Sequence, residues 1–227
     1  MIGVIAAMDI EAEGLIEKLS SGTATEILGI TFTQGILHGQ PMVVAVSGIG
    51  KVNAGMCTAL MIREFKPEMI FSIGVAGSIS EKLNLLDICI ASFVCQHDFD
   101  TSPFGDPLGL LPGHTQVCMP CDAHLVKVLE KSAAAYGNVF VDGMACGDQF
   151  IANIDKKLEI HRLFSACACE MESGAIGQVA SQNRTPFAVV RVISDSLTDD
   201  AHMEYEVFKK KAAEKTVSVI CDAVQAL

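Results

Sequence analysis

The chain has 227 residues, of which 50% are hydrophobic and 19% are charged, and its formal net charge at pH 7 is −11. This length and composition allow one large hydrophobic core, so we predict a single domain over 1–227. An acidic chain lacks the basic surface that nucleic acids and anionic membranes attract, so neither is expected as a partner.

The N-terminal stretch Met1–Met8 carries no basic residue and leads into Asp9 and Glu11, which is not the pattern of a secretory signal peptide. Most of the nine cysteines lie in apolar segments, where a free thiol behaves as a small hydrophobic group. Cys118 and Cys121 form a CxxC pair, but no second Cys or His pair lies beside it at zinc-finger spacing. We therefore expect reduced cysteines, no metal site and a cytoplasmic location.

Apolar runs and helical spacing predict these elements in the first part of the chain: a strand at Met1–Met8, a helix at Asp9–Leu19, two strands within Thr31–Ser47 around the turn His38–Pro41, a helix at Lys51–Phe65, a strand at Met69–Ile73 that ends in the glycine-rich turn Gly74–Gly77, and a strand at Leu86–Val94. The segment Gln96–Gln116 is rich in glycine, proline and aspartate and is predicted to be a long loop. Long loops in compact domains are usually functional or disordered.

The rest of the chain continues the alternation, with a helix at 122–135, strands around 138–152, a helix at 154–163, a strand at 166–171, a helix at 173–182, a strand at 187–194 and a final helix at 204–226. Strands that alternate with helices predict an α/β fold, a three-layer α/β/α sandwich with a mixed, largely parallel central sheet. In such sheets, binding and catalytic groups collect beyond the carboxyl ends of the strands.

Polar or glycine-rich groups follow several predicted strands: Asp9–Glu11, Ser47–Val52, Gly74–Gly77, Glu170 with Glu172, and Ser194–Ser196. Residues two apart in a strand point to the same face, so Glu170 and Glu172 are expected to share a side and flank Met171 if the strand runs through both. Glu172 and Asp195 each also suit a helix N-cap or first turn. Several acids at one sheet edge, with little basic compensation, favour a site for a neutral polyhydroxylated ligand or a cationic one.

Five separated segments resemble, in order, the motifs of the 5′-methylthioadenosine/S-adenosylhomocysteine nucleosidases of the nucleoside phosphorylase superfamily: Ile5–Glu11, Ser47–Asn53, Gly147–Ile151, Glu170–Glu172 and Val190–Asp195. Each segment is short, but together they span nearly the whole chain. The resemblance implies a nucleoside phosphorylase-like fold. It also implies hydrolysis of the N-glycosidic bond between adenine and a 5′-thio-substituted ribose, through an oxocarbenium-like transition state and without a cofactor.

The resemblance implies roles for the acids. Glu11 matches the residue that activates the attacking water, and Asp195 matches the general acid at the purine N7, which must be held protonated or share a proton with the base. Glu172 matches the residue that accepts hydrogen bonds from the ribose hydroxyls and steadies the developing positive charge. Met171 is expected beneath the sugar. Glu170 is given, as a hypothesis, the task of orienting Arg191.

Other matched residues are expected to bind the base and the sugar. Phe150 matches the residue that stacks on adenine, and the backbone of Ile151 matches the group that reads the purine edge. Ser194 and Arg191 are expected to support the acids. The turn Val75-Ala76-Gly77 is expected against the ligand. Val75 replaces the small hydroxyl residue usual in the family, which puts a contact to ribose or water in question.

The loop 96–116 resembles the family segment that crosses a homodimer interface, so a homodimer with sites shared between subunits is expected. The resemblance draws the pocket for the 5′-substituent from both subunits, with Thr101, Phe104 and Pro112 from the neighbour and Ile49 and Tyr205 from the home subunit. Relatives often carry an apolar residue at the position of Thr101 and phenylalanine at that of Tyr205. The pocket is therefore expected to be more polar here.

Three alternative functions stay open on the sequence. A nucleoside phosphorylase carries a basic phosphate-binding sequence after the first strand, where this chain has Asp9-Ile-Glu11. A hydrolase of another purine nucleoside, such as futalosine, is a second alternative. A non-catalytic purine-binding protein is expected to lose Glu11 or Asp195, and both are present. A Walker-type P-loop is absent, and Ser47–Gly50 is too short to indicate a dinucleotide site.

Overall fold

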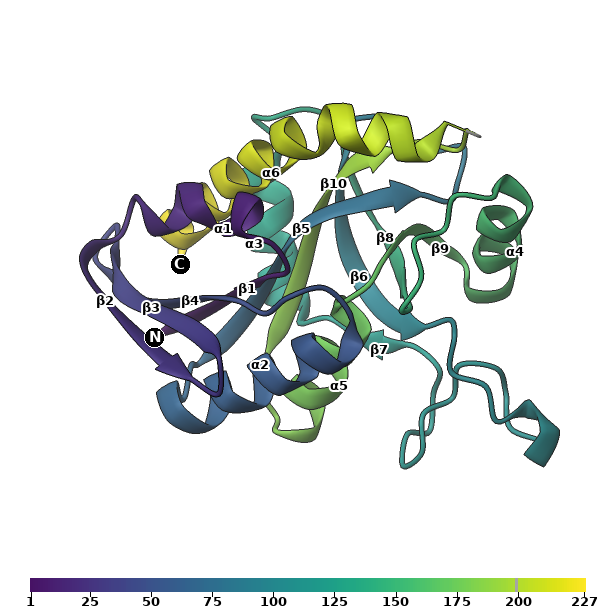
Figure 1. The fold of residues 1–227 in the computed structure, drawn as a ribbon, viewed down its shortest axis with the longest axis horizontal. Coiled ribbons are helices and arrows are strands. Elements are labelled where there is room, and N and C mark those ends of the chain that lie inside the picture. Colours follow the sequence, from purple (N-terminus) through teal and green to yellow (C-terminus); the bar gives the residue numbers. More distant parts are fainter. Residues whose placement is uncertain (199) are drawn as a thin grey trace.

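A mixed ten-stranded sheet runs through the middle of the computed structural model, which describes residues 1–198 and 200–227 (Figure 1). The strands are β1 Ile2–Ala6, β2 Ser20–Ile27, β3 Ile30–Leu37, β4 Gln40–Val46, β5 Met69–Ser78, β6 Ile88–Gln96, β7 Met119–Pro120, β8 Val139–Cys146, β9 Ala166–Glu170 and β10 Phe187–Asp195. The helices are α1 Asp9–Ile16, α2 Lys51–Phe65, α3 Ala123–Ala133, α4 Ile154–Phe164, α5 Ser173–Gln182 and α6 Ala201–Ala226, with a 3-10 turn at Ser102–Phe104.

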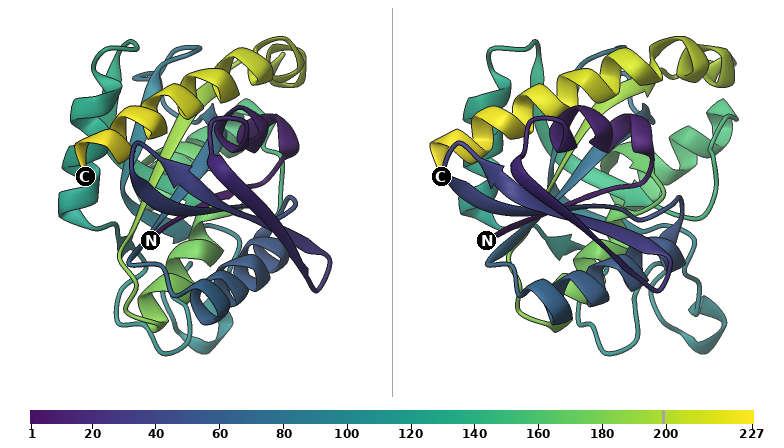
Figure 2. Two further views of the ribbon diagram at one scale, coloured as in Figure 1. Left: turned by 90° about the vertical axis from the view of Figure 1, so that its left-hand side faces the viewer. Right: turned by 60° about the vertical axis from the view of Figure 1, so that its left-hand side comes forward.

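Helices cover both faces of the sheet. α1 and α3 pack with α6 on one face, and α2 packs with α5 on the other (Figures 1 and 2). The central strands are hydrophobic on both sides, as expected for a sheet that is covered twice: all five residues of β1 and all nine of β10 are buried. This arrangement confirms the predicted α/β sandwich. None of the described helices is both long and apolar enough to cross a membrane.

The strand pairing brings three strand ends together. β5 pairs in parallel with β1 and β10 and antiparallel with β9. β10 also pairs with β6, β6 with β8 and β8 with β9. Together with the pairings of β5, these close the five strands β5, β10, β6, β8 and β9 into a ring. At the junction, Gly77 of β5 lies opposite both Asp195 of β10 and Cys169 of β9. The chain segments that follow these strands therefore meet at one edge.

Several element boundaries differ from the prediction, while α2 lies where it was predicted. β5 does not end at Ile73 but runs on through the expected glycine-rich turn, because its backbone there pairs with β10 and β9. β2 was not predicted, since seven of its eight residues are exposed and carry no apolar alternation. α6 begins at Ala201, three residues before the predicted start.

Candidate active site

A cavity of about 350 Å³ opens where β1, β5, β9 and β10 end. Twelve of the predicted site residues share its wall: Glu11, Ile49, Val75, Ala76, Gly77, Phe150, Glu170, Met171, Glu172, Ser194, Asp195 and Tyr205. Ala7, Met8 and Cys169 also line it, although the sequence did not single them out. Because these residues come from opposite ends of the chain, the cavity exists only in the folded protein.

Five other predicted residues lie outside this cavity. Ile151 lines a smaller adjoining chamber of about 40 Å³. Arg191 is buried in the protein core. Thr101, Phe104 and Pro112 belong to the loop that extends away from the body at the lower right of Figure 1, and Phe104 is 88% exposed. Within a single chain, the loop residues therefore do not contribute to the cavity wall.

Glu11 is held by backbone amides although it is only 3% exposed. Its Oε2 accepts hydrogen bonds from the N–H groups of Ala7 and Met8, and its Oε1 accepts one from Val75, each at 3.0 Å. A Cβ on Gly74 would overlap the carboxylate, so only glycine permits this approach. Burial raises the pKa of Glu11, and the charge of Arg191 with the three amides offsets part of this effect. The carboxylate is thus fixed in place with an elevated proton affinity.

Asp195 is the last residue of β10, so it is not the N-cap of α6, and the interpretation of Asp195 as a helix cap is wrong. Its Oδ1 accepts a hydrogen bond from the Ser194 hydroxyl at 3.0 Å, and its Oδ2 accepts one from the Lys157 ammonium at 3.0 Å. Burial raises the pKa of Asp195, and Lys157 followed by Ser194 lowers it in part. The side chain is oriented at both oxygens.

Lys157 is the functional candidate that the sequence analysis missed. It lies on α4 and its side chain is 1% exposed. Its spacing from Ile160 and Phe164, three and seven residues along, places it on the buried face of the helix. That periodicity in the sequence was the available signal, because a lysine on an apolar helix face needs a buried counter-charge.

Glu170 does not flank Met171 from the same strand face as Glu172, because β9 ends at Glu170. Its carboxylate accepts hydrogen bonds from the backbone N–H and the hydroxyl of Ser173, the latter at 2.6 Å, and so caps the first turn of α5. It also accepts one from Arg191 at 2.6 Å, within a fully buried ion pair. Glu170 therefore contacts Arg191 as hypothesised and also anchors α5.

Glu172 occupies the N-cap position of α5, yet its side chain makes no capping bond. Its Oε1 instead accepts a hydrogen bond from the N–H of Gly50 at 2.8 Å, which leaves the carboxyl group facing the cavity. Burial first, and then the charge of Glu170, raise the pKa of Glu172 to about 8, against the lowering effect of Arg191. The raised pKa favours a proton on this group near neutral pH, and a ligand that donates hydrogen bonds to it would favour the loss of that proton.

Glu172→Gln is expected to stabilise the free protein at alkaline pH. A raised carboxyl pKa means that the folded state binds the proton more tightly, so stability falls as pH rises from the ordinary value near 4.5 through about 8. Glutamine stays neutral and can still accept the bond from Gly50. The melting temperature of the variant should exceed that of the wild type by a few degrees at pH 9, since one kcal/mol corresponds to about 2–4 °C at this size. The two curves should converge below about pH 4, where the carboxyl group is protonated in both the folded and the unfolded state, and a variant that is less stable at pH 9 would contradict the assignment.

Apolar and aromatic side chains complete the cavity. Phe150 and Tyr205 make an edge-to-face contact with ring centroids 5.7 Å apart. The Tyr205 hydroxyl lies 3.4 Å from the sulfur of Met8, and Met171 lines the wall beside the carboxylates. Phe150 is 47% exposed, so its ring is available to a flat ligand. The cavity thus combines a small set of polar groups with apolar and aromatic walls, as small-molecule sites do.

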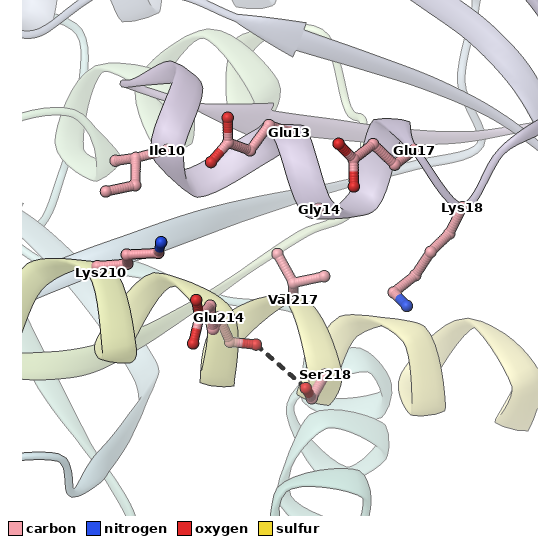
Figure 3. Close-up of a pocket in the computed structure, with 9 residues that line it drawn as sticks. All are labelled: Ile10, Glu13, Gly14, Glu17, Lys18, Lys210, Glu214, Val217 and Ser218. Atoms are coloured by element: carbon pink, nitrogen blue, oxygen red, sulfur yellow. Dashed lines mark hydrogen bonds between the residues drawn. The ribbon is translucent and has the colours of Figure 1, made fainter.

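A second groove lies between α1 and α6 and has a different character (Figure 3). Glu13, Glu17 and Glu214 line it, and all three are exposed to solvent. Its only drawn hydrogen bond joins the Ser218 hydroxyl to the Glu214 carbonyl within α6. Solvated surface acids of this kind need no ligand, so the buried carboxylates of the first cavity mark the candidate active site. Residues 1–198 and 200–227 hold no group of three or more His, Cys, Asp or Glu side chains suited to a metal ion.

Comparisons with known proteins agree over the whole chain. The family model described as "Phosphorylase superfamily" matches residues 1–225. A 5′-methylthioadenosine/S-adenosylhomocysteine nucleosidase of Shewanella piezotolerans is 38% identical over 214 residues, which cover 93% of each chain.

Solved structures agree as well. A nucleosidase of the same name from Neisseria meningitidis, in complex with methylthio-immucillin-A, has a TM-score of 0.96 at 32% identity and covers 100% of this chain and 99% of its own. A futalosine hydrolase mutant of Helicobacter pylori has a TM-score of 0.95 at 29% identity, with coverage of 100% and 99%. The protein therefore belongs to the phosphorylase superfamily and, within it, to the family of 5′-methylthioadenosine/S-adenosylhomocysteine nucleosidases.

Proposed function

We propose that this protein hydrolyses the N-glycosidic bond of 5′-methylthioadenosine and of S-adenosylhomocysteine and releases adenine and the 5-thio-substituted ribose. The observation that carries the proposal is the placement of Glu11, Glu172 and Asp195 in one cavity, each held by hydrogen bonds of its own. The names of the similar proteins support the same substrates.

The reaction makes two demands that separate acids can meet. The purine must gain a proton as the bond from N9 to C1′ breaks, and a water molecule must be activated to attack C1′ from the other side. Asp195 is proposed as the acid at N7, with Ser194 and Lys157 holding its two oxygens. Glu11 is proposed as the base that takes a proton from the water. The backbone amides that clamp it leave little freedom for its carboxylate.

Glu172 is proposed to bind the ribose hydroxyls and to stabilise the sugar cation that forms as the base departs. Hydroxyl donors and a nearby positive charge both favour the ionised form of the carboxyl group. The attraction between this carboxylate and the sugar therefore increases as the sugar becomes positively charged. Glu170 and Arg191 are proposed to fix Glu172 indirectly, since Glu170 accepts a hydrogen bond from the Glu172 backbone N–H at 3.2 Å. Met171 would then lie against the sugar.

The base is proposed to bind at the other end of the cavity. Phe150 would stack on the purine, and the backbone of Ile151 would read its edge from the adjoining chamber. Ala76 and Gly77 line the cavity where β5 pairs with Asp195. Val75 has no hydroxyl to offer the ligand, and its backbone N–H donates a hydrogen bond to Glu11. The residues near Phe150 are thus suited to a flat heterocycle.

Phosphate should have no effect on the reaction. Free 5-methylthioribose is expected from 5′-methylthioadenosine at the same rate with and without phosphate, because a buried carboxylate at Glu11 repels the anion that a phosphorylase must bind. Chromatography of the sugar product checks this. A phosphorylated sugar as the main product would instead identify a phosphorylase.

Futalosine-type hydrolysis is the second candidate function, and the high structural similarity to the Helicobacter pylori futalosine hydrolase favours it. The two candidates share the same reaction at C1′. Competition between 5′-methylthioadenosine and futalosine in one assay separates them. Preferential turnover of futalosine would move the assignment to the second candidate.

The active protein is proposed to be a homodimer in which Thr101, Phe104 and Pro112 complete the 5′-substituent pocket beside Ile49 and Tyr205 of the other subunit. The exposure of Phe104 supports this, because a large apolar side chain at a loop tip is stabilised by burial in an interface. A cytoplasmic location is proposed as well, and the nine free thiols support a reducing environment.

Light scattering should therefore give twice the chain mass of 24.1 kDa. Phe104→Ala should raise KM for S-adenosylhomocysteine while the catalytic carboxylates stay intact, because only the pocket for the long 5′-substituent loses a contact. A fully active monomer at micromolar concentration would exclude the shared pocket.

A further inference from the structure

The Ser47–Gly50 turn supports the carboxyl group of Glu172. The N–H of Gly50 donates a hydrogen bond to Oε1 of Glu172 at 2.8 Å, and among the described residues no other group donates one to this carboxyl group. Gly48 and Gly50 have φ angles of +86° and +96°, in the region that glycine adopts freely. A turn with two such glycines has little rigidity of its own. The position of Glu172 therefore depends on what holds the turn from outside.

Asp148 holds this turn at its junction with α2. Its Oδ1 accepts a hydrogen bond from the backbone N–H of Lys51, the first residue of α2, at 2.7 Å. A Cβ added to Gly50 would lie 3.0 Å from the same oxygen, so the carboxylate lies against both residues. The first N–H groups of a helix have no partner within it. Here Gly50 and Lys51 direct two of these groups to two carboxylates, Glu172 and Asp148, from separate segments of the chain.

Asp148 is held in turn by a partly buried ion pair. Its backbone N–H donates to Oδ2 of Asp98 at 2.9 Å, and the Lys51 ammonium donates to Oδ1 of Asp98 at 2.5 Å. The side chains of Lys51 and Asp98 are 16% and 17% exposed. Lys51 also donates to the side chain of Gln96 at 3.2 Å, and Gln96 donates to the carbonyl of Gly174 in α5 at 3.2 Å. These contacts join the turn, the loop after β6, the loop after β8 and α5.

We propose that Asp148 is a positioning residue for the reaction, and that it acts through Lys51 and Gly50 to hold the Glu172 carboxyl group at the ribose hydroxyls. The inference rests on the proposed function, in which Glu172 binds those hydroxyls. Asp148 is exposed and does not line the cavity or the adjoining chamber, so it acts on the substrate through Glu172. The ion pair of Lys51 with Asp98 keeps Asp148 in place. Since Asp98 belongs to the loop 96–116, the same contacts tie that loop to the sugar end of the site.

A role in folding alone makes a different prediction. If Asp148 only stabilises the start of α2, its loss affects the hydrolysis of every nucleoside equally. If it positions Glu172, its loss weakens the contact to the ribose hydroxyls in particular. A nucleoside without the 3′-hydroxyl lacks part of that contact already and should be less sensitive. The ratio of the kcat/KM values for the two nucleosides, measured within one variant, therefore isolates the positioning effect.

The test compares 5′-methylthioadenosine with its 3′-deoxy analogue, with released adenine quantified by chromatography. The wild type should prefer the nucleoside that has both hydroxyls. Asp148→Ala should raise KM for 5′-methylthioadenosine and lower the ratio of kcat/KM values by about 3- to 10-fold, which is part of the roughly 10- to 100-fold effect of a whole hydrogen bond to a charged group. Asp148→Asn keeps an oxygen that accepts from the Lys51 N–H, so it should restore the wild-type ratio.

Two further variants complete the test. Lys51→Met removes the cation that pairs with Asp98 and keeps the backbone N–H of residue 51, so it should lower the ratio by less than Asp148→Ala does. Asp122→Ala is the matched control, because Asp122 caps α3 through two backbone amides. It should lower the melting temperature and leave the ratio unchanged.

The outcomes separate the inference from the proposed function. A wild-type ratio in Asp148→Ala, an equal loss with both nucleosides, or a failure of Asp148→Asn to restore the ratio each overturns the inference and leaves the proposed function intact. If Asp148→Ala does not fold, an unchanged ratio in Lys51→Met overturns the inference and a lowered ratio supports it. A wild-type protein that releases no adenine from 5′-methylthioadenosine overturns the proposed function itself.

Discussion

Asp195→Asn is expected to lower kcat for 5′-methylthioadenosine by about 10²–10⁴, the range for loss of a general acid. Asparagine keeps the shape of the side chain, and its amide can still bond Ser194 and Lys157, but it has no proton to give to the departing purine. Burial raises the pKa of Asp195, so the native carboxyl group holds its proton to a higher pH than an exposed aspartate does. Steady-state kinetics at neutral pH measures the effect, and near-native kcat would remove Asp195 from the mechanism.

The same variant should also be less stable, for a reason that is independent of catalysis. Lys157 and Asp195 form an ion pair with side chains 1% and 4% exposed, and removal of one partner of such a pair typically costs about 3–5 kcal/mol. The double variant Asp195→Asn with Lys157→Met removes both charges, so it should recover melting temperature without recovering kcat. Asp122→Asn is the control for the substitution itself. Asp122 caps α3 through two backbone amides, and asparagine caps about as well.

The sequence predicted helices and strands correctly where their burial produces a regular pattern of apolar residues. Periodic apolar positions located α2, and continuous hydrophobic runs located β1 and β10. β2 could not be found this way, because it pairs only at the sheet edge with β3 and its side chains face solvent. The extension of β5 past Ile73 depends on pairing with β9 and β10, which are about 90 and 115 residues away in the chain. The residues of β5 themselves do not indicate which distant strands will pair with it.

The sequence motifs predicted which residues belong to the site, but not all of the contacts that connect them. Resemblance supplied Glu11, Glu172 and Asp195, and the cavity contains all three. It did not supply Lys157, the partner of Asp195, for which the helical spacing with Ile160 and Phe164 was the available signal in the sequence. Glu170 and Glu172 were expected to share a strand face if the strand ran through both, and this condition is not met. The strand ends at Glu170, and α5 begins at Ser173, whose N–H donates a hydrogen bond to the Glu170 carboxylate.

Glu11→Gln should lower kcat by about 10²–10⁴ and leave KM nearly unchanged, because it removes the proton acceptor for water and no contact to the substrate. The glutamine amide has one acceptor oxygen where the carboxylate has two, so at least one of the N–H groups of Ala7, Met8 and Val75 loses its partner. A buried donor without a partner costs about 1–3 kcal/mol, so the melting temperature should fall slightly as well. Glu13→Gln on the exposed face of the same helix is the matched control and should change neither quantity.

The pH profile and the comparison with Glu172→Gln give this prediction its sharpest test. A base must be ionised to accept a proton, so wild-type kcat should fall on the acidic side at a pH above the ordinary range of glutamate, since burial raises the pKa of Glu11. The rate is measured at saturating substrate, where the ribose hydroxyls are proposed to hold Glu172 ionised. That acidic fall should disappear from the residual activity of Glu11→Gln. Glu172→Gln should instead raise KM as well as lower kcat, because Glu172 is proposed to hold the ribose hydroxyls before reaction begins. If the acidic fall persists in Glu11→Gln, or if Glu11→Gln raises KM as strongly as Glu172→Gln does, then Glu11 acts on the substrate rather than on the water, and the division of labour between the two carboxylates is wrong.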